Sequence, residues 1–206
     1  MNFISIDSIT EKPNISLFID NKYIDCYNNC SSSSYIPDGL NSLLRDNSLD
    51  IKLLDYIAVT IGPGSYTGIR VGLSIAQGIA FSLSIPLVPI NTMNFLHSAT
   101  KATNNKELII GFPAYDNNIF YFNIKDGELG SGKLKNINSF KGKSIFGIQL
   151  DKYKDIIDYN EINFSSRLLG DYSIENYGSL HTEDMSSISP VYLDKFSVEK
   201  RTQSND

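Results

Sequence analysis

The most distinctive chemical feature of the sequence is a glycine-rich turn, residues 62–65, that directly follows the apolar run 56–61. Glycine permits positive φ angles and close backbone approach, and Pro63 stiffens the turn between its two glycines. Ser65 or Thr67 is suited to cap a helix that begins here. A strand, a glycine-rich turn and a helix N-terminus together form a possible anion site, because free amides and the helix dipole point to the same place.

This turn lacks the further residues that a standard nucleotide-binding loop requires. A P-loop needs Lys and then Ser or Thr after its second glycine, whereas Ile69 and Arg70 follow Gly68 here. The dinucleotide fingerprint G-x-G-x-x-G does not occur either, and residues 64–68 have the wrong spacing for a G-x-S-x-G nucleophile elbow. A degenerate nucleotide-binding module, with an anion at the helix N-terminus, stays open.

The helix expected after the turn, about residues 67–83, is apolar around well over half of its circumference. Its small residues recur every four positions and form one smooth ridge: Gly68, Gly72, Ala76 and Ala80. Surface helices usually carry an apolar stripe of only about 100° or a little more, so we expect burial on two sides. The small ridge would let another helix approach closely. Periodicity alone leaves open whether the second side is buried inside the chain or against another subunit.

Apolar runs bounded by turn residues predict short strands, first in an antiparallel meander and then joined by helical crossovers. We expect strands near residues 2–7, 15–19, 23–27, 56–61, 87–90, 107–112, 119–124, 144–150 and 191–193. Helices are expected near residues 36–46, 67–83, 91–100 and 165–177. The polar stretch 102–106 marks the boundary between two predicted subdomains, 1–104 and 105–206.

The composition, with 41% hydrophobic and 20% charged residues, is that of a soluble globular protein. The net charge of −5 argues against a lone tRNA binder, which needs a basic face to neutralise phosphates. The densest basic stretch is interpreted as a solvated hairpin edge. It contains Lys133, Lys135, Lys141 and Lys143. Cys26 and Cys30 do not form a C-x-x-C pair, and no leader or membrane span is recognisable, so we expect a cytoplasmic protein.

The stretch from Gly62 to Gly72, GPGSYTGIRVG, resembles the signature G-P-G-S-[FY]-T-G-[LI]-R-[IV]-G of the TsaB (YeaZ) family nearly residue for residue. Weaker similarity runs along most of the chain, in "FISIDS" with Asp7, in "IPLVPINTM" and in "SPVYL". The resemblance implies an α/β, actin- and hexokinase-like (ASKHA) fold with two related subdomains, whose mixed β-sheets are flanked by helices.

The resemblance also implies that the chain is a non-catalytic subunit of the complex that makes threonylcarbamoyladenosine at adenosine 37 of tRNA. TsaB proteins pair with TsaD, which carries the metal and the transferase site; the ATPase TsaE joins them, and many TsaB proteins form homodimers alone. No cofactor is expected on this chain, because ATP or ADP and Mg²⁺ belong to partner subunits or the joint interface, and tRNA binds only through the complex. The candidate interface residues are Gly62, Pro63, Gly64, Ser65, Tyr66, Thr67, Gly68, Arg70, Gly72 and Ala76.

The chain lacks some of the residues that enzymes of this implied fold use to bind phosphate and metal. Enzymes of the fold hold phosphates on a hairpin with a glycine beside an aspartate, but no glycine follows Asp7, which is interpreted as structural. The metal pair of TsaD needs two histidines at i and i+4, whereas His97 and His181 are far apart. Residues 116–118 replace an Asp-Ala-Arg segment of the family, and Asp194 replaces an arginine. A stand-alone nucleotide-binding enzyme or peptidase remains the alternative.

Overall fold

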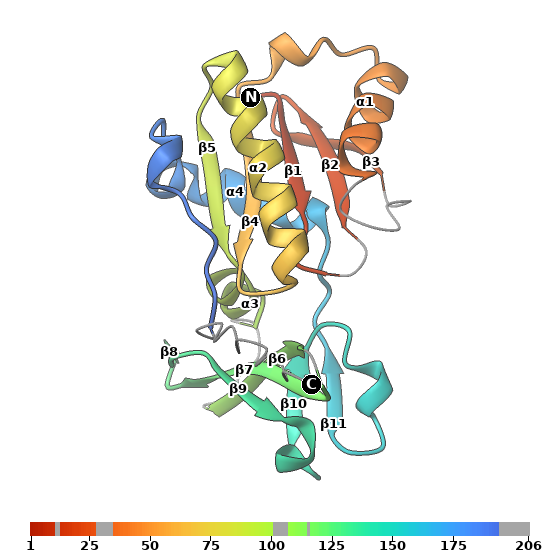
Figure 1. Ribbon diagram of the computed structural model, residues 1–206, viewed down its shortest axis with the longest axis vertical. Helices are drawn as coiled ribbons and strands as arrows, with labels where there is room; N and C mark the ends of the chain where they lie inside the picture. Colours follow the sequence, from red (N-terminus) through yellow and green to blue (C-terminus); the bar gives the residue numbers. More distant parts are fainter. Residues whose placement is uncertain (11–12, 28–34, 101–106, 115, 194–206) are drawn as a thin grey trace, which may run out of the picture.

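The computed structural model describes residues 1–10, 13–27, 35–100, 107–114 and 116–193, which build two lobes around two β-sheets (Figure 1). Both sheets mix parallel and antiparallel strands, and helices flank them, so the expected α/β class is confirmed. The predicted subdomain boundary at 102–106, together with Cys30 and Asp194, lies outside the described residues.

The first sheet has the strand order β3-β2-β1-β4-β5. The predicted meander forms its first part: β1 (Phe3–Asp7), β2 (Asn14–Ile19) and β3 (Lys22–Tyr27) pair antiparallel. The strands β4 (Tyr56–Gly62) and β5 (Leu87–Asn91) then add in parallel to β1. The continuous apolar run of β4 explains its central place, because helices cover both faces of a parallel strand.

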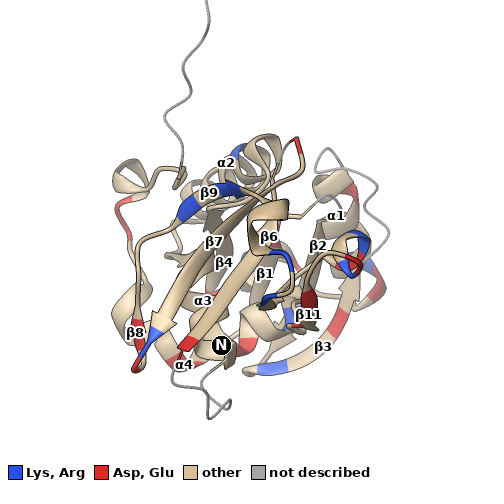
Figure 2. Ribbon diagram, turned by 90° about the horizontal axis from the view of Figure 1, so that it is seen from below, with Lys and Arg blue, Asp and Glu red and all other residues tan. Residues whose placement is uncertain are grey.

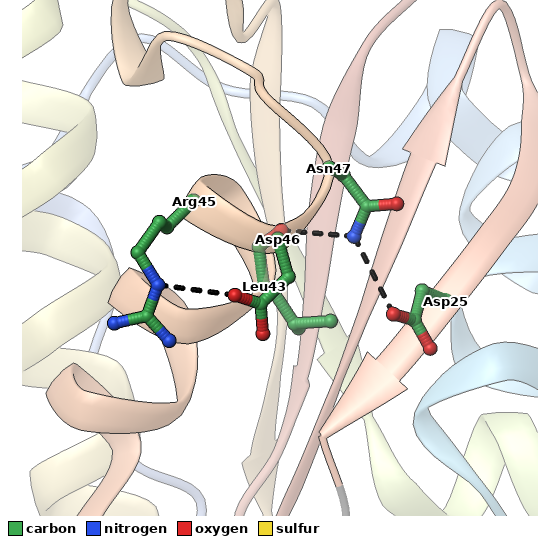
Figure 3. A network of polar contacts seen from close by, with 5 residues as sticks. All are labelled: Asp25, Leu43, Arg45, Asp46 and Asn47. Carbon is green, nitrogen blue, oxygen red and sulfur yellow. Dashed lines mark hydrogen bonds and ion pairs between the residues drawn. The ribbon is translucent and has the colours of Figure 1, made fainter.

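Helices α1 (Ile36–Asp46) and α2 (Tyr66–Leu83) cover one face of this sheet, whereas α3 (Thr92–Thr100) and α4 (Ser166–Leu180) pack with its other face (Figure 1). The sequence sets the start of α3, because Asn91 Oδ1 accepts from the amide of Met93 at 2.9 Å. The end of α1 is tied to β3 by Asn47, whose Nδ2 donates to the Leu43 carbonyl at 2.9 Å and to Asp25 at 3.4 Å (Figure 3).

The second sheet has the order β11-β10-β6-β7-β8, and β9 pairs with β7. Its strands are β6 (Glu107–Pro113), β7 (Asn118–Lys125), β8 (Glu128–Leu129), β9 (Lys133–Asn136), β10 (Ser144–Gly147) and β11 (Asp158–Glu161). Short 3₁₀ helices complete the chain: η2 (Ile51–Leu53), η3 (Ile137–Phe140), η4 (Asp151–Tyr153) and η5 (Met185–Ser187). Two of the predicted edge lysines, Lys133 and Lys135, are exposed residues of β9, and Figure 2 shows blue, the colour of Lys and Arg, on this strand.

Two strand predictions in the second half need correction. Residues 191–193 form no strand, because this segment bonds to the sheet at a single described point, from the Val191 amide to the Ile61 carbonyl at 2.8 Å. The strand predicted over 144–150 ends at Gly147, and Gln149 takes a φ of +53°, which breaks extended structure. The short strands β8, β9 and β11 were not predicted, since their polar sequences lack an alternating pattern.

The helix α4 follows the second sheet in the chain but packs on the first, against β1 and β2. Buried hydroxyls fix its first turn: Ser5 Oγ donates to the Ser166 carbonyl at 2.5 Å, and the hydroxyls of Ser16 and Ser166 lie 2.6 Å apart. The Ser166 amide donates to Asn14 Oδ1 at 2.6 Å. The C-terminal part of the described chain therefore belongs, by its packing, to the first lobe.

Candidate functional site

The glycine-rich turn is shaped by contacts that only glycine tolerates. Gly62 has a φ of +99°, and a Cβ there would lie 2.6 Å from the Val191 carbonyl oxygen. A Cβ on Gly64 would lie 2.5 Å from Cβ of Ile9. Gly62 and Pro63 are joined by a cis peptide bond. The turn is thus fitted against the loop after β1 on one side and against the C-terminal segment on the other.

Two amides at this turn and at the start of α2 form hydrogen bonds within the chain. Ser65 caps α2, because its Oγ accepts from the Gly68 amide at 3.2 Å, while Thr67 is exposed in the first turn. The Ser65 amide donates to the Ile9 carbonyl at 2.8 Å. Two of the amides that an anion would need are therefore already bonded, which weakens the interpretation of the turn as an anion site.

The small ridge of α2 faces the chain's own first sheet. A Cβ on Gly68 would collide with the Ser8 carbonyl oxygen, and one on Gly72 would collide with the Ser8 hydroxyl. Ala76 and Ala80 are fully buried in the same core. The expectation that the ridge receives a helix of another subunit is therefore corrected, because the close approach that it permits is made inside the chain. Gly68, Gly72 and Ala76 can influence an interface only by positioning α2.

The opposite side of α2 is exposed, and we call it the outer face: Tyr66, Thr67, Arg70, Ser74, Gly78, Phe81 and Ser82. The Phe81 side chain is 80% exposed. A Cβ on Gly78 would meet no atom of the described residues within 4 Å, so no described neighbour calls for glycine there. The sequence contains no Asp or Glu from Tyr56 to Lys106. In a chain with 23 acidic residues, the outer face therefore offers no carboxylate of its own.

Three side chains meet at the N-terminal end of the outer face. The guanidinium carbon of Arg70 lies 4.0 Å from the ring centroid of Tyr66 and 5.6 Å from that of Tyr192. Arg70 Nε donates to the Tyr192 hydroxyl at 2.7 Å, and the two rings lie 5.2 Å apart. Arg70 and Tyr66 were candidates from the sequence, but Tyr192 was missed because it is 122 residues away in the chain.

Tyr192 belongs to a segment that runs along the flank of α2, Met185–Leu193, which we call the C-terminal strap. Gln77 Nε2 donates to the carbonyls of Met185 and Ile188, at 2.9 and 3.1 Å. A Cβ on Gly132, in the second lobe, would lie 2.6 Å from the Leu193 side chain. The strap therefore joins α2 to the second lobe and places Tyr192 beside Arg70.

A second candidate site is the cleft between the lobes, about 440 Å³ in volume. Its lining residues are Asp7, Thr10, Asn14, Ile148, Gln149, Glu161, Ile162, Asn163 and Phe164. Asp7 is fully buried and accepts hydrogen bonds from the Ile9 amide at 3.0 Å and from Asn14 Nδ2 at 3.2 Å. Burial raises the pKa of Asp7 to about 7, against these two hydrogen bonds, which lower it. Its described lining residues combine two carboxylates with carboxamides and include no Lys or Arg.

The two histidines belong to different helices, α3 and the end of α4. His97 lies in the last turn of α3, and the His181 ring stacks on Tyr177 with their centroids 4.7 Å apart. Within the described ranges, no three His, Cys, Asp or Glu side chains are grouped as metal ligands would be. No helix among the described residues has the length and apolar character needed to span a membrane. Asp116 and Asn117, at the departure from the family pattern, take φ angles of +52° and +56° in a turn.

Two mixed-sheet lobes, a cleft between them and helices on the faces define a protein of the actin- and hexokinase-like class. The structure of YeaZ from Pseudomonas aeruginosa has the same fold: its TM-score is 0.68 at 17% identity, and the likeness covers 93% of this chain and 99% of that one. The chain belongs to the TsaD family, described as tRNA N6-adenosine threonylcarbamoyltransferase, whose family model matches residues 31–171.

Curated relatives confirm the likeness to TsaB that the signature predicted. The tRNA threonylcarbamoyladenosine biosynthesis protein TsaB of Haemophilus influenzae is 27% identical over 112 residues, which are 53% of this chain and 48% of that protein. TsaB of Bacillus subtilis is 32% identical over 100 residues, 47% of this chain and 43% of that protein. The chain therefore spans about half the length of the curated relatives it matches.

Proposed function

We propose that the chain is a non-catalytic subunit of a complex that forms threonylcarbamoyladenosine on tRNA, and that it docks on a TsaD homologue. The family, and the names of its TsaB relatives, support the reaction class. We also propose that the ATPase TsaE joins the pair, with tRNA and nucleotide bound by the assembled complex. Alone, the chain would form a homodimer through the same face.

The outer face of α2 is the observation that carries the docking proposal. A glycine in the middle of a helix costs about 1 kcal/mol relative to alanine, and no described residue lies close enough to Gly78 to offset this cost. Phe81, 80% exposed, lies three residues further along the helix. The cores of protein interfaces are depleted of charged residues and enriched in aromatic ones. A partner helix that approaches at Gly78 and covers Phe81 accounts for the glycine, for the exposed aromatic ring and for the lack of a carboxylate on the outer face.

The second part of the proposal, that the chain is not itself the catalyst, rests on the cleft. Phosphate-binding sites neutralise charge with cations or with free backbone amides. The cleft presents Asp7 and Glu161 instead, and no Lys or Arg is among the lining residues that the structure describes. Two amides of the signature are already bonded, that of Ser65 to the Ile9 carbonyl and that of Gly68 to the Ser65 hydroxyl. This arrangement favours a supporting subunit over the alternative, a stand-alone nucleotide-binding enzyme or peptidase.

The proposal is tested by reconstitution with the TsaD homologue, TsaE and the upstream threonylcarbamoyl-AMP synthase of the same organism. We expect modified tRNA to form only when the chain is present. We expect Glu161→Gln, at the exposed wall of the cleft, to leave the rate unchanged. Product formation without the chain would contradict the proposed function, and a hundredfold slower reaction with Glu161→Gln would contradict its non-catalytic part.

A further inference from the structure

The Arg70 side chain is held in one place although it lies on the surface. Its guanidinium stacks 4.0 Å above the Tyr66 ring, and its Nε donates to the Tyr192 hydroxyl at 2.7 Å. Tyr66 and Tyr192 are 36% and 37% exposed, so the cluster is open to solvent on one side. Nε bonds to Tyr192 and the guanidinium also interacts with Tyr66, so its planar fork of N–H donors has more donors than these contacts use. A side chain ordered in this way loses little further entropy when it binds a partner.

No carboxylate of the described chain neutralises this guanidinium. Arg70 takes part in none of the ion pairs formed by described residues. The pKa of Arg70 is raised first by the Tyr192 hydroxyl and then by Tyr66, and no acidic residue contributes. Arg70 also lies near the N-terminus of α2, where the helix dipole disfavours a cation. The described part of the chain therefore presents an ordered cation without a carboxylate partner.

Arg70 shares the outer face with the residues of the proposed docking site. Arg70, Ser74 and Gly78 follow one another at intervals of four, and Phe81 continues the same exposed stripe. Eight residues of helix separate Arg70 from Gly78, which is about 12 Å. A standard interface buries about 800 Å² on each partner, so a subunit seated at Gly78 also covers Arg70. A cation that loses its water in this way needs a counter-charge from the partner.

We propose that Arg70, fixed between Tyr66 and Tyr192, is the receptor for a carboxylate side chain of the subunit that docks on α2; this rests on the proposed function. The planar guanidinium suits a two-pronged bond to a carboxylate. Tyr and Arg are also the residues that most often dominate binding energy at interfaces. Tyr192 is a positioning residue, and through it the C-terminal strap becomes part of the docking site.

The test measures the affinity of the chain for its TsaD homologue by titration calorimetry at several salt concentrations. Removing the charge in Arg70→Ala should weaken binding by tenfold or more and flatten its dependence on salt, because the partner carboxylate is left buried without a partner. Arg70→Lys should recover the salt dependence and only part of the affinity, since it keeps the charge and loses the fork. Tyr192→Phe, which removes only the hydroxyl, should weaken binding a few-fold.

Arg167→Ala is the matched control, because Arg167 also stacks on a tyrosine, 4.6 Å from the Tyr23 ring, but lies on α4. We expect it to bind as the wild type does. Unchanged affinity and salt dependence in Arg70→Ala would overturn the inference. The inference would also be overturned if Arg70→Ala paired normally but its complex lost affinity for tRNA, because Arg70 would then bind a phosphate of the tRNA.

The inference and the proposed function fail in distinguishable ways. If Phe81→Glu abolishes pairing and Arg70→Ala does not, only the carboxylate receptor is wrong. If the wild-type chain does not pair with the TsaD homologue at micromolar concentrations, both the docking proposal and the proposed role of Arg70 are wrong.

Discussion

Among single residues, Asp7 departs most from its ordinary chemistry. Its carboxyl is buried at the floor of the cleft, and its pKa is raised from 3.8 to about 7 by burial. The folded state therefore holds a proton between these values that the unfolded state has released. Ionisation of Asp7 must then destabilise the fold, in the opposite sense to a salt-bridged aspartate.

We predict that the free energy of unfolding falls as pH rises from about 4 to about 7, and stays low above 7, with an Asp7 contribution of about 4 kcal/mol. Urea denaturation at pH 5, 6, 7 and 8 measures this contribution. In Asp7→Asn the free energy of unfolding should depend less on pH. At pH 5 this variant should be less stable than the wild type, because the Ile9 amide and Asn14 both need acceptors. Equal slopes in the two proteins would contradict the raised pKa.

The glycines of α2 allow a second prediction at this scale. Gly72→Ala should destabilise the chain by about 1–3 kcal/mol, because the added methyl collides with Ser8 in a packed core. Gly78→Ala should stabilise it by about 0.5–1 kcal/mol, because its methyl enters open space and alanine favours helix. Thermal unfolding of both variants and of the wild type measures these two changes in stability. Shifts of the same sign would show that α2 is not oriented as described.

For whole elements, much of the first lobe could be predicted from the sequence. The ends of α2 and α3 follow from local signals, a Ser65 cap and an Asn91 cap, which act over three residues and need no tertiary contact. The periodicity of α2 also predicted two apolar sides. It did not predict which side meets the sheet, because a helical pattern carries no information about its neighbour.

The C-terminal strap could not be predicted for a related physical reason. Its residues lack a periodic pattern, and "SPVYL" was predicted to end in a strand at 191–193. Its contacts to Gln77, Ile61 and Arg70 span more than a hundred residues. Only the folded chain brings Tyr192 beside Arg70, so the receptor has no signal in the sequence.

The strap supplies a prediction of its own. Gln77→Leu removes both hydrogen bonds that hold Met185 and Ile188 to α2, at about 1 kcal/mol each. We expect faster hydrogen exchange at the Val191 amide and weaker binding of the TsaD homologue, because Tyr192 is no longer held beside Arg70. Asn176→Leu, which removes a carboxamide hydrogen bond to a backbone carbonyl on α4, is the control. Unchanged exchange at Val191 would mean that the strap is held by other contacts.

At the scale of the whole molecule, the two lobes keep the architecture of an actin- and hexokinase-like protein but lack the local chemistry of its enzymes. The cleft is present, and its aspartate, Asp7, stands at the end of β1, yet no Lys or Arg is among the described lining residues and the turn after Asp7 contains no glycine. Features that find no use inside the chain lie instead on the outer face of α2. We propose that the functional surface of this chain is the outer face of α2 and not the cleft.

The central claim, that the outer face of α2 docks on a TsaD homologue, is tested most directly by light scattering behind size-exclusion chromatography. Phe81→Glu is compared with Leu53→Glu, because Leu53 is also an exposed apolar side chain, 57% exposed, but lies on η2. We predict a heteromeric peak with the wild type and with Leu53→Glu, and its loss with correctly folded Phe81→Glu. A heteromeric peak of full height with Phe81→Glu would contradict the account.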